Sequence, residues 1–211
     1  MGPAMTTHRL VEAAEVVSLF VGYLALWRLK RHRDRRRTGV DPEVIHMATT
    51  PVQRYFARLL RVMTGLVVLV IGLHAGAPDA WPPLVRVAAL DPWWFDVAGA
   101  VLGVAGLAVC AAAQATMGSA WRVGIDVDRR TDLVTGGIYR RVRNPTYLGL
   151  HLVNLGLWII WPTTLVASFA VLFFVVMELQ VRAEEEHLVN MHGEAYRAYA
   201  GRSWRYIPWI Y

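Results

Sequence analysis

The chain has 211 residues, of which 55% are hydrophobic and 18% are charged, a length that suits one domain of moderate size. The apolar residues form blocks separated by charged blocks, which excludes a disordered chain and is typical of a protein partly immersed in lipid. The net charge of +6 lies between the apolar blocks, so it does not indicate nucleic-acid binding. The single cysteine, Cys110, excludes an internal disulfide framework and a zinc site made of cysteines.

Five apolar stretches predict about five membrane-spanning helices in an all-α fold. They are Val11–Leu29, Leu59–Ala77, Phe95–Ala115, Tyr147–Trp161 and Thr163–Leu179. A bilayer core needs about 20 apolar residues in helical form, so the first three are long enough and the last two are short. The last two meet at Pro162, which lacks a backbone donor and favours the first turn of a helix. They therefore predict a short helical hairpin.

The distribution of lysine and arginine predicts how the chain is oriented. Ten of them lie in Arg28–Arg61, six in Trp121–Arg143 and four from Arg182 onward, while only Arg9 and Arg86 lie elsewhere. Basic connections stay on the cytosolic side of a membrane. We therefore expect an integral protein of a bacterial inner membrane, with its N-terminus outside and its C-terminus in the cytosol.

The spans divide the chain into two parts. Residues 1–115 are expected to form three transmembrane helices with a basic cytosolic loop, and residues 116–211 a cofactor-binding region with the hairpin and a cytosolic tail. In the third span, Gly99, Gly103 and Gly106 leave flat surfaces where another helix can approach closely.

Two further features are expected at the membrane surfaces. The loop between the second and third spans carries Trp81, Trp93 and Trp94, and because indole rings favour the headgroup layer they predict an aromatic belt. The basic run Arg28–Arg37 has two interpretations, since it can anchor the topology or bind anionic lipid headgroups.

Polar residues lie in and beside the last two spans, where ionisable groups usually face a cavity or one another. His151 and Asn154 are three residues apart and share a helical face, on which they either bond neighbouring helices or contact a substrate. Glu178, Arg182 and Glu185 share another face, and Glu178–Arg182 is either an ion pair or part of a site. The sequence has no Rossmann glycine turn, Walker sequence or HExxH, and its histidines are scattered, so we expect no metal site.

Two segments flanking the hairpin carry a more specific pattern. The first is Thr131-Asp-Leu-Val-Thr-Gly-Gly-Ile-Tyr-Arg-Arg-Val-Arg-Asn-Pro-Thr-Tyr-Leu-Gly149. The second begins at Glu184-Glu-Glu-His-Leu188 and continues through Gly193, Tyr196 and Tyr199 to Arg205-Tyr-Ile-Pro208. In order, spacing and hairpin length they resemble the C-terminal signature of the isoprenylcysteine carboxyl methyltransferases and the related phospholipid methyltransferases. The first three spans resemble that family only as hydrophobic helices.

The resemblance implies an S-adenosylmethionine-dependent methyltransferase. It implies cofactor contacts at Thr131, Asp132, Leu133, Val134, Tyr139, Asn144, Pro145, Thr146, Tyr147 and Glu184. A carboxylate such as Glu184 suits a cationic group of this cofactor, and tyrosine rings offer π faces to its sulfonium. Methyl transfer depends on alignment more than on acid–base help, so the only catalytic candidates are Glu184 and Arg182. On the acceptor side we expect Gln180, Arg182, His151 and Asn154.

Three positions depart from the family pattern. Asn144 stands in place of a histidine and His192 in place of a phenylalanine, and Gln180 replaces an arginine suited to an acceptor carboxylate. The family implies carboxyl O-methylation of a prenylated or other lipophilic acceptor. N-methylation of a phospholipid amine and methylation of a small thiol are the alternatives within methyl transfer. An NADPH-dependent sterol-type reductase, which the Glu184–Glu186 cluster disfavours, and a non-catalytic lipid-binding protein are the alternatives of other classes.

Overall fold

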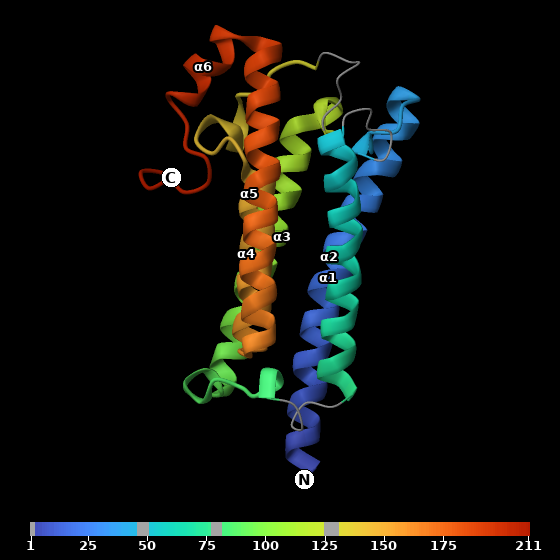
Figure 1. Ribbon diagram of the computed structural model, residues 1–211, viewed down its shortest axis with the longest axis vertical. Coiled ribbons are helices and arrows are strands. Elements are labelled where there is room, and N and C mark those ends of the chain that lie inside the picture. Colours follow the sequence, from blue (N-terminus) through green and yellow to red (C-terminus); the bar gives the residue numbers. More distant parts are fainter. Residues whose placement is uncertain (1–2, 46–50, 77–81, 125–130) are drawn as a thin grey trace.

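The computed structural model describes residues 3–45, 51–76, 82–124 and 131–211, and this part of the chain is all-α, as the sequence predicted. Its long helices run along the long axis of the molecule (Figure 1). They are α1 (Pro3–Thr38), α2 (Pro51–Gly76), α3 (Trp93–Met117), α4 (Pro145–Ile160) and α5 (Thr164–His192), followed by the short α6 (Glu194–Ala200). The extended pairing in the described residues is limited to isolated bridges.

Four of these helices, α1, α2, α3 and α5, are long and apolar enough to cross a membrane. The chain is therefore an integral membrane protein. The fourth predicted span is α4, an apolar helix of 16 residues and so shorter than the other four. Five spans remain a prediction.

Several helices extend beyond the apolar stretches, since α1 begins at Pro3 rather than Val11 and α2 at Pro51 rather than Leu59. The second arm of the hairpin is not short, because α5 continues 13 residues beyond Leu179 to His192. The run Arg28–Arg37 is helical and belongs to α1, rather than to a loop. The extension of α1 is rich in arginine and that of α5 in glutamate, two residues that favour helix, and several of their charges are paired along or beside the helix.

The end of α1 is bound to the connection after α3. Lys30 lies 2.7 Å from an oxygen of Asp34 and donates to the carbonyl of Gly118 at 2.6 Å. Arg31 donates to Asp41 at 2.9 Å and also pairs with Glu43, just after the helix. The Arg31 guanidinium holds the pKa of the Asp41 carboxyl below its usual range. These contacts explain why a strongly basic segment stays helical.

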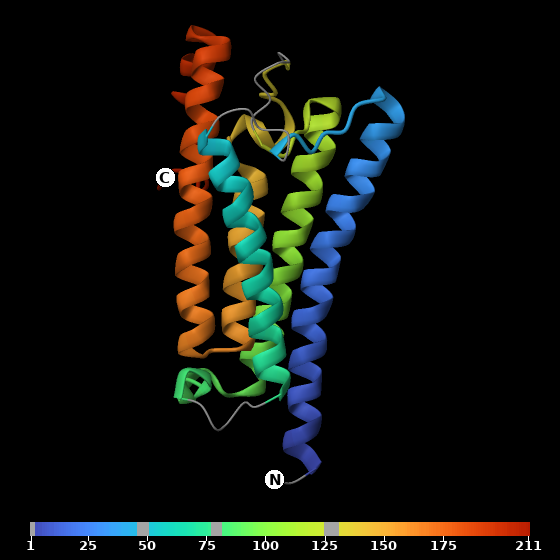
Figure 2. The ribbon, with the colours of Figure 1, turned by 45° about the vertical axis from the view of Figure 1, so that its right-hand side comes forward.

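Both views of the ribbon show how the ends of the helices are arranged (Figures 1 and 2). The start of α4, the end of α5 and α6 lie at one end, here called the motif end, together with the start of α2. The N-terminus and the connection 82–92 lie at the opposite, far end. The helix ends next to all three groups of basic residues therefore lie at the motif end. This agrees with the prediction that these groups share one side of the bundle.

The closest helix pair is α3 with α4, and glycines make it possible. A Cβ on Gly106 would lie 2.5 Å from the carbonyl oxygen of Gly149, and a Cβ on Gly99 would lie 2.7 Å from that of Gly156. Gly103 faces Leu19 of α1 as well. The prediction that these glycines allow close helix approach is confirmed.

His74 of α2 packs against the turn between α4 and α5. The rings of His74 and Trp161 stack with centroids 4.3 Å apart, and His74 Nε2 lies 3.3 Å from the Thr163 hydroxyl. Thr163 also caps α5 by accepting from the backbone of Val166 at 3.3 Å. Pro162 lies in the turn just before this cap rather than inside the helix.

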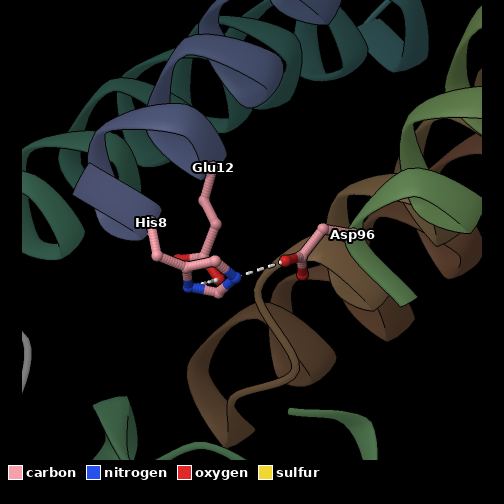
Figure 3. Close-up of side chains that lie close together, drawn as sticks. All are labelled: His8, Glu12 and Asp96. Atoms are coloured by element: carbon pink, nitrogen blue, oxygen red, sulfur yellow. Dashed lines mark ion pairs between the residues drawn. The ribbon is translucent and has the colours of Figure 1, made fainter. Parts of the chain in front are cut away.

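A polar cluster at the far end joins α1 to α3. Figure 3 shows the His8 ring between Glu12 and Asp96, with Nε2 2.8 Å from Asp96 and Nδ1 3.5 Å from Glu12. Arg86 binds Glu12 at 2.7 Å. Glu12 and Asp96 are buried, so these contacts offset the cost of placing two carboxylates in the bundle. Their grouping could hold a cation, but Arg86 already neutralises Glu12.

Two of the three tryptophans of the predicted aromatic belt lie among the described residues. Trp93 and Trp94 are exposed at the start of α3, as side chains in a headgroup layer would be. Trp81 lies outside the described residues.

Candidate functional site

The two motif segments meet at the motif end. The tail after α6 runs beside the segment before α4, and three backbone hydrogen bonds join them. Arg143 donates to Trp204 at 2.8 Å, Trp204 donates to Arg141 at 2.9 Å and Asn144 donates to Arg205 at 3.2 Å. The segments on either side of the hairpin therefore lie together, while their role in binding a cofactor remains a prediction.

A pair of buried tyrosines fixes the loop that precedes α4. The Tyr199 hydroxyl of α6 donates to the carbonyl of Tyr139 at 2.8 Å. Burial raises the pKa of Tyr199 to about 12, so this hydroxyl keeps its proton at neutral pH. Gly137 begins the turn with φ 55°, and a Cβ there would lie 2.8 Å from Thr116 of α3. Only glycine combines this backbone conformation with this close approach.

Glu184 lies where α5 passes the first turn of α4. The Tyr147 hydroxyl donates to its Oε1 at 2.7 Å, and the Gln180 amide donates to the same oxygen at 2.8 Å. Its Oε2 accepts no hydrogen bond from the described residues, and no lysine or arginine among them pairs with it. Glu184 is thus a partly buried carboxylate that neutral donors hold in place.

The next carboxylate, Glu185, is neutralised by the protein itself. Arg143 donates to Oε1 at 2.7 Å, Asn144 donates to the same oxygen at 2.8 Å, and Arg205 binds Oε2 at 2.7 Å. The side chain of Asn144, which the resemblance placed on the cofactor, therefore has a partner within the protein. Its contact with a cofactor remains a prediction.

Glu178, two turns earlier on α5, receives several donors. Arg182 and Arg205 pair with Oε1 at 2.8 and 3.1 Å, and Tyr206 donates to Oε2 at 2.9 Å. The Tyr211 hydroxyl donates to Oε1 at 2.8 Å. The interpretation of Glu178–Arg182 as an ion pair is confirmed, and Arg205 joins it to Glu185.

The remaining predicted cofactor residues lie in two places. Pro145 is buried and begins α4, and the carbonyl of the next residue, Thr146, accepts from the Cys110 thiol at 3.4 Å. Residues 131–134, which are Thr131, Asp132, Leu133 and Val134, form an extended segment before the 3-10 turn Gly137–Arg140, with Asp132 exposed. In the described part of the chain, no hydrogen bond joins their side chains to Glu184.

The four predicted acceptor residues differ in how much of their bonding capacity is used. Gln180 binds Glu184 and Arg182 binds Glu178, while Asn154 donates to the backbone of Ala170 on α5 at 3.2 Å. His151 contacts the rings of Phe173, Phe174 and Tyr206, and its buried Nε2 has no hydrogen-bond partner in the described residues. Among the described residues, His151 is thus the one of the four with a fully buried polar atom that has no hydrogen-bond partner.

Sequence reasoning missed the roles of Arg143, Arg205 and Tyr206, although all three stand inside the quoted segments. The available signal was charge balance, because Glu178 and Glu185 near a membrane surface require cations. It also missed the cluster of His8, Glu12, Asp96 and Arg86. Carboxylates within or beside apolar spans, together with one of two isolated arginines, were the signal there.

Comparison with known proteins agrees with this geometry. Residues 94–195 match the family model described as phospholipid methyltransferase, a stretch that runs from the start of α3 into α6. The protein-S-isoprenylcysteine O-methyltransferase of Dictyostelium discoideum is 29% identical over 122 residues, covering 56% of this chain and 50% of that protein. Protein-S-isoprenylcysteine O-methyltransferase A of Arabidopsis thaliana is 28% identical over 122 residues, covering 56% and 61%. This chain thus matches about half to three fifths of their length.

A solved structure extends the similarity to the whole bundle. The structure of the eukaryotic intramembrane Ras methyltransferase, an isoprenylcysteine carboxyl methyltransferase, superposes with a TM-score of 0.54. The match covers 93% of this chain and 68% of that one at 19% identity, and so concerns the fold. The family model, the two relatives and the fold thus all point to similarity with the isoprenylcysteine carboxyl methyltransferases and phospholipid methyltransferases.

Proposed function

We propose that the protein is an S-adenosylmethionine-dependent methyltransferase that acts on a lipophilic acceptor at the membrane surface. Methylation of an isoprenylcysteine-like carboxylate is the leading reaction. The donor would bind at the motif end beside Glu184 and Tyr147, with the segment Thr131–Val134 closing its other side. The relatives named for this reaction, each matched over 122 residues, support the assignment.

The observation that carries the proposal is the contrast between Glu184 and its neighbour. Glu185 and Glu178 have arginine partners, whereas Glu184 is held by an amide and a phenol and keeps one oxygen unused. A carboxylate without a cation in a partly buried site attracts a positively charged ligand. S-adenosylmethionine carries two such groups, a sulfonium and an ammonium.

The reaction needs no proton transfer when the acceptor is a carboxylate. An acceptor oxygen forms a bond to the methyl carbon while the bond from carbon to sulfur breaks, and sulfur keeps that electron pair. The products are a methyl ester and neutral S-adenosylhomocysteine. The protein therefore has to align the two reactants and exclude water, which suits a site at the end of a packed membrane bundle.

His151 is the residue we assign to the acceptor side. It lies one turn further along α4 than Tyr147, and its ring contacts those of Phe173, Phe174 and Tyr206. Its unpaired Nε2 can donate to or accept from a polar acceptor atom that enters from the lipid. Asn154 and Arg182 would position the acceptor site indirectly. Asn154 joins α4 to α5, and Arg182 joins α5 to the C-terminal tail.

The donor site is tested by replacing Glu184 with glutamine, which keeps the size of the side chain and can still accept from Tyr147. Glu184→Gln should weaken S-adenosylmethionine binding about tenfold or more, measured by calorimetry on detergent-solubilised protein, since one charge-assisted contact corresponds to that factor. The matched control is Glu186→Gln, an exposed position on the same helix, which should leave binding unchanged. Equal affinity in both variants would remove Glu184 from the donor site, and tighter binding of NADPH than of S-adenosylmethionine would favour a reductase.

N-methylation of a phospholipid amine is the second candidate, and Gln180 favours it. Gln180 is buried and bonded to Glu184, so this position offers no cation to an acceptor carboxylate. A labelled-methyl assay that offers a farnesylcysteine and phosphatidylethanolamine side by side separates the two. Label in a base-labile methyl ester supports the leading reaction, while label in the phospholipid amine supports the second.

A further inference from the structure

A basic cavity lies at the start of α2 and is not part of the donor site. Its volume is about 380 Å³, and it is lined by Ile45, Ala57 and three arginines, Arg54, Arg58 and Arg61. The arginines are spaced at i, i+4 and i+7, so they stand on one face of α2, one turn apart. Met63, which packs against Val176 and Met177 of α5, lies on the opposite face of the helix.

Unlike Arg31 and Arg86, these arginines have no carboxylate partner among the described residues. The only side-chain hydrogen bond of the three within that part of the chain is from Arg61 to the carbonyl of Ala57 on its own helix, at 3.2 Å. The acids of the preceding segment, Asp41 and Glu43, are bound to Arg31. The sequence between Ile45 and Pro51, His-Met-Ala-Thr-Thr, contains no acid. Among the described residues, the three guanidinium groups therefore face the cavity without a carboxylate partner, and such a cavity favours an anion.

The same face of α2 continues toward the far end as an exposed apolar surface. Gly65, Val68, Leu69 and Gly72 follow the arginines in register, and Val68 and Leu69 are more than half exposed. α1 and α2 lie close together at the far end and diverge toward the motif end in both views (Figures 1 and 2). In a membrane helix, exposed apolar residues contact acyl chains. The arginines thus lie at the headgroup level, directly above a lipid-facing surface.

We propose that Arg54, Arg58 and Arg61 form a binding site for the phosphate group of an anionic phospholipid, whose acyl chains lie along the exposed face of α2. Guanidinium groups match phosphate oxygens with paired hydrogen bonds, which an ammonium group does not provide. A free phosphate ion would use the same arginines but would gain nothing from Val68 and Leu69, so the geometry favours the lipid. The site is independent of methyl transfer, and its test needs no assay of activity.

The test compares the full-length protein in nanodiscs of phosphatidylcholine with and without phosphatidylglycerol. We expect phosphatidylglycerol to raise the thermal unfolding midpoint of the wild type and to remain bound in native mass spectrometry. The triple variant R54Q/R58Q/R61Q should lose both effects while matching the wild type in pure phosphatidylcholine. The single variant Arg58→Gln, which perturbs the helix least, should weaken phosphatidylglycerol binding about tenfold.

The matched control removes the same charge from another place. R33Q/R36Q/R37Q takes three exposed arginines from the last turns of α1, outside the cavity, and should keep the response to phosphatidylglycerol. Equal loss in the control would mean that surface charge alone draws the lipid, and an unchanged response in R54Q/R58Q/R61Q would remove the site. If inorganic phosphate in pure phosphatidylcholine gives the same stabilisation, the ligand is a soluble anion and the proposed lipid is wrong.

Discussion

Arg205 shows how a single residue organises the motif end. It pairs with Glu185 and Glu178, which lie two turns apart on α5, and its own side chain is largely buried. Because it neutralises these two carboxylates, the negative charge that remains for a ligand is concentrated on Glu184. Glu184 and Glu185 are thus adjacent in sequence but differ in charge balance, because Glu185 has arginine partners and Glu184 has none among the described residues.

Replacing Arg205 with glutamine should therefore destabilise the protein. Glu185 would keep Arg143, but Glu178 would lose its buried partner, and breaking such a pair lowers the free energy of unfolding by about 3 kcal/mol. Thermal unfolding in detergent measures the change. Arg202→Gln, an exposed position in the same tail, serves as the control and should stay within about 0.5 kcal/mol of the wild type. Equal stability of the two variants would contradict the structural role of Arg205.

For single residues, the sequence predicted which side chains lie in the same region better than it predicted their hydrogen-bond partners. Motif spacing brought Tyr147 and Glu184 to one region, and helical periodicity put Glu178 and Arg182 on one face. It could not predict that Asn144 donates to Glu185, because Arg143, Asn144 and Arg205 all reach the same carboxylate only after the tail folds back. Partner choice depends on that three-dimensional arrangement, which local periodicity does not encode.

Among the helices, the pair α3 and α4 forms the rigid part of the fold. Glycines on both helices let the two backbones touch directly. No flexible side chain lies between them at these contacts that could adjust if one helix shifted. Tyr147 lies in the first turn of α4, next to this contact. The position of the proposed donor site is therefore set by glycine packing as much as by its own hydrogen bonds.

A methyl group added at this contact should be unfavourable, although alanine is the better helix former. Gly106→Ala would place a Cβ 2.5 Å from the carbonyl oxygen of Gly149, so the helices must separate, and unfolding free energy should fall by about 1–3 kcal/mol. Gly72→Ala on α2 meets no atom within 4 Å and should leave stability unchanged or raise it by up to about 1 kcal/mol. The thermal midpoint should fall in Gly106→Ala and should stay the same or rise in Gly72→Ala. A stabilised Gly106→Ala protein would mean that the two helices are not packed this closely.

The helices themselves were predictable in kind and less so in extent. Apolar runs located the centres of all five long helices, since lipid-facing residues dominate those runs. The ends were placed too early in α1 and α5, because hydropathy stops where charge begins while the helix does not. Arg28–Arg37 and Gln180–His192 are polar helix, stabilised by pairs such as Lys30–Asp34 and Gln180–Glu184 that a count of apolar residues cannot register.

For the whole molecule, the arrangement of charge is one-sided. Basic helix ends gather at the motif end, and the far end has Arg86 enclosed by Glu12, Asp91 and Asp96. Arg86 is therefore neutralised by carboxylates. It adds less positive charge to the far end than the sequence alone indicates, so the difference in charge between the two ends is larger. The positive-inside rule then favours a cytosolic motif end, where S-adenosylmethionine would be supplied.

Reporter fusions test this orientation. Green fluorescent protein joined after Tyr211 should fluoresce in a bacterial host, and alkaline phosphatase at the same place should be inactive, because it needs the oxidising periplasm. Alkaline phosphatase inserted in the connection 82–92, after Ala89, should be active. Active phosphatase after Tyr211 would reverse the proposed orientation.

The pairing of Trp204 and Arg205 with the segment before α4 has a consequence for biosynthesis. The ribosome makes Arg143 and the hairpin first, and Trp204 and Arg205 some sixty residues later. Until the tail emerges, the loop before α4 lacks the backbone hydrogen bonds that join it to Trp204 and Arg205, although Arg143 and Arg182 can already pair with Glu185 and Glu178. The proposed methyl-donor site should therefore form only after the tail has been translated and folded back.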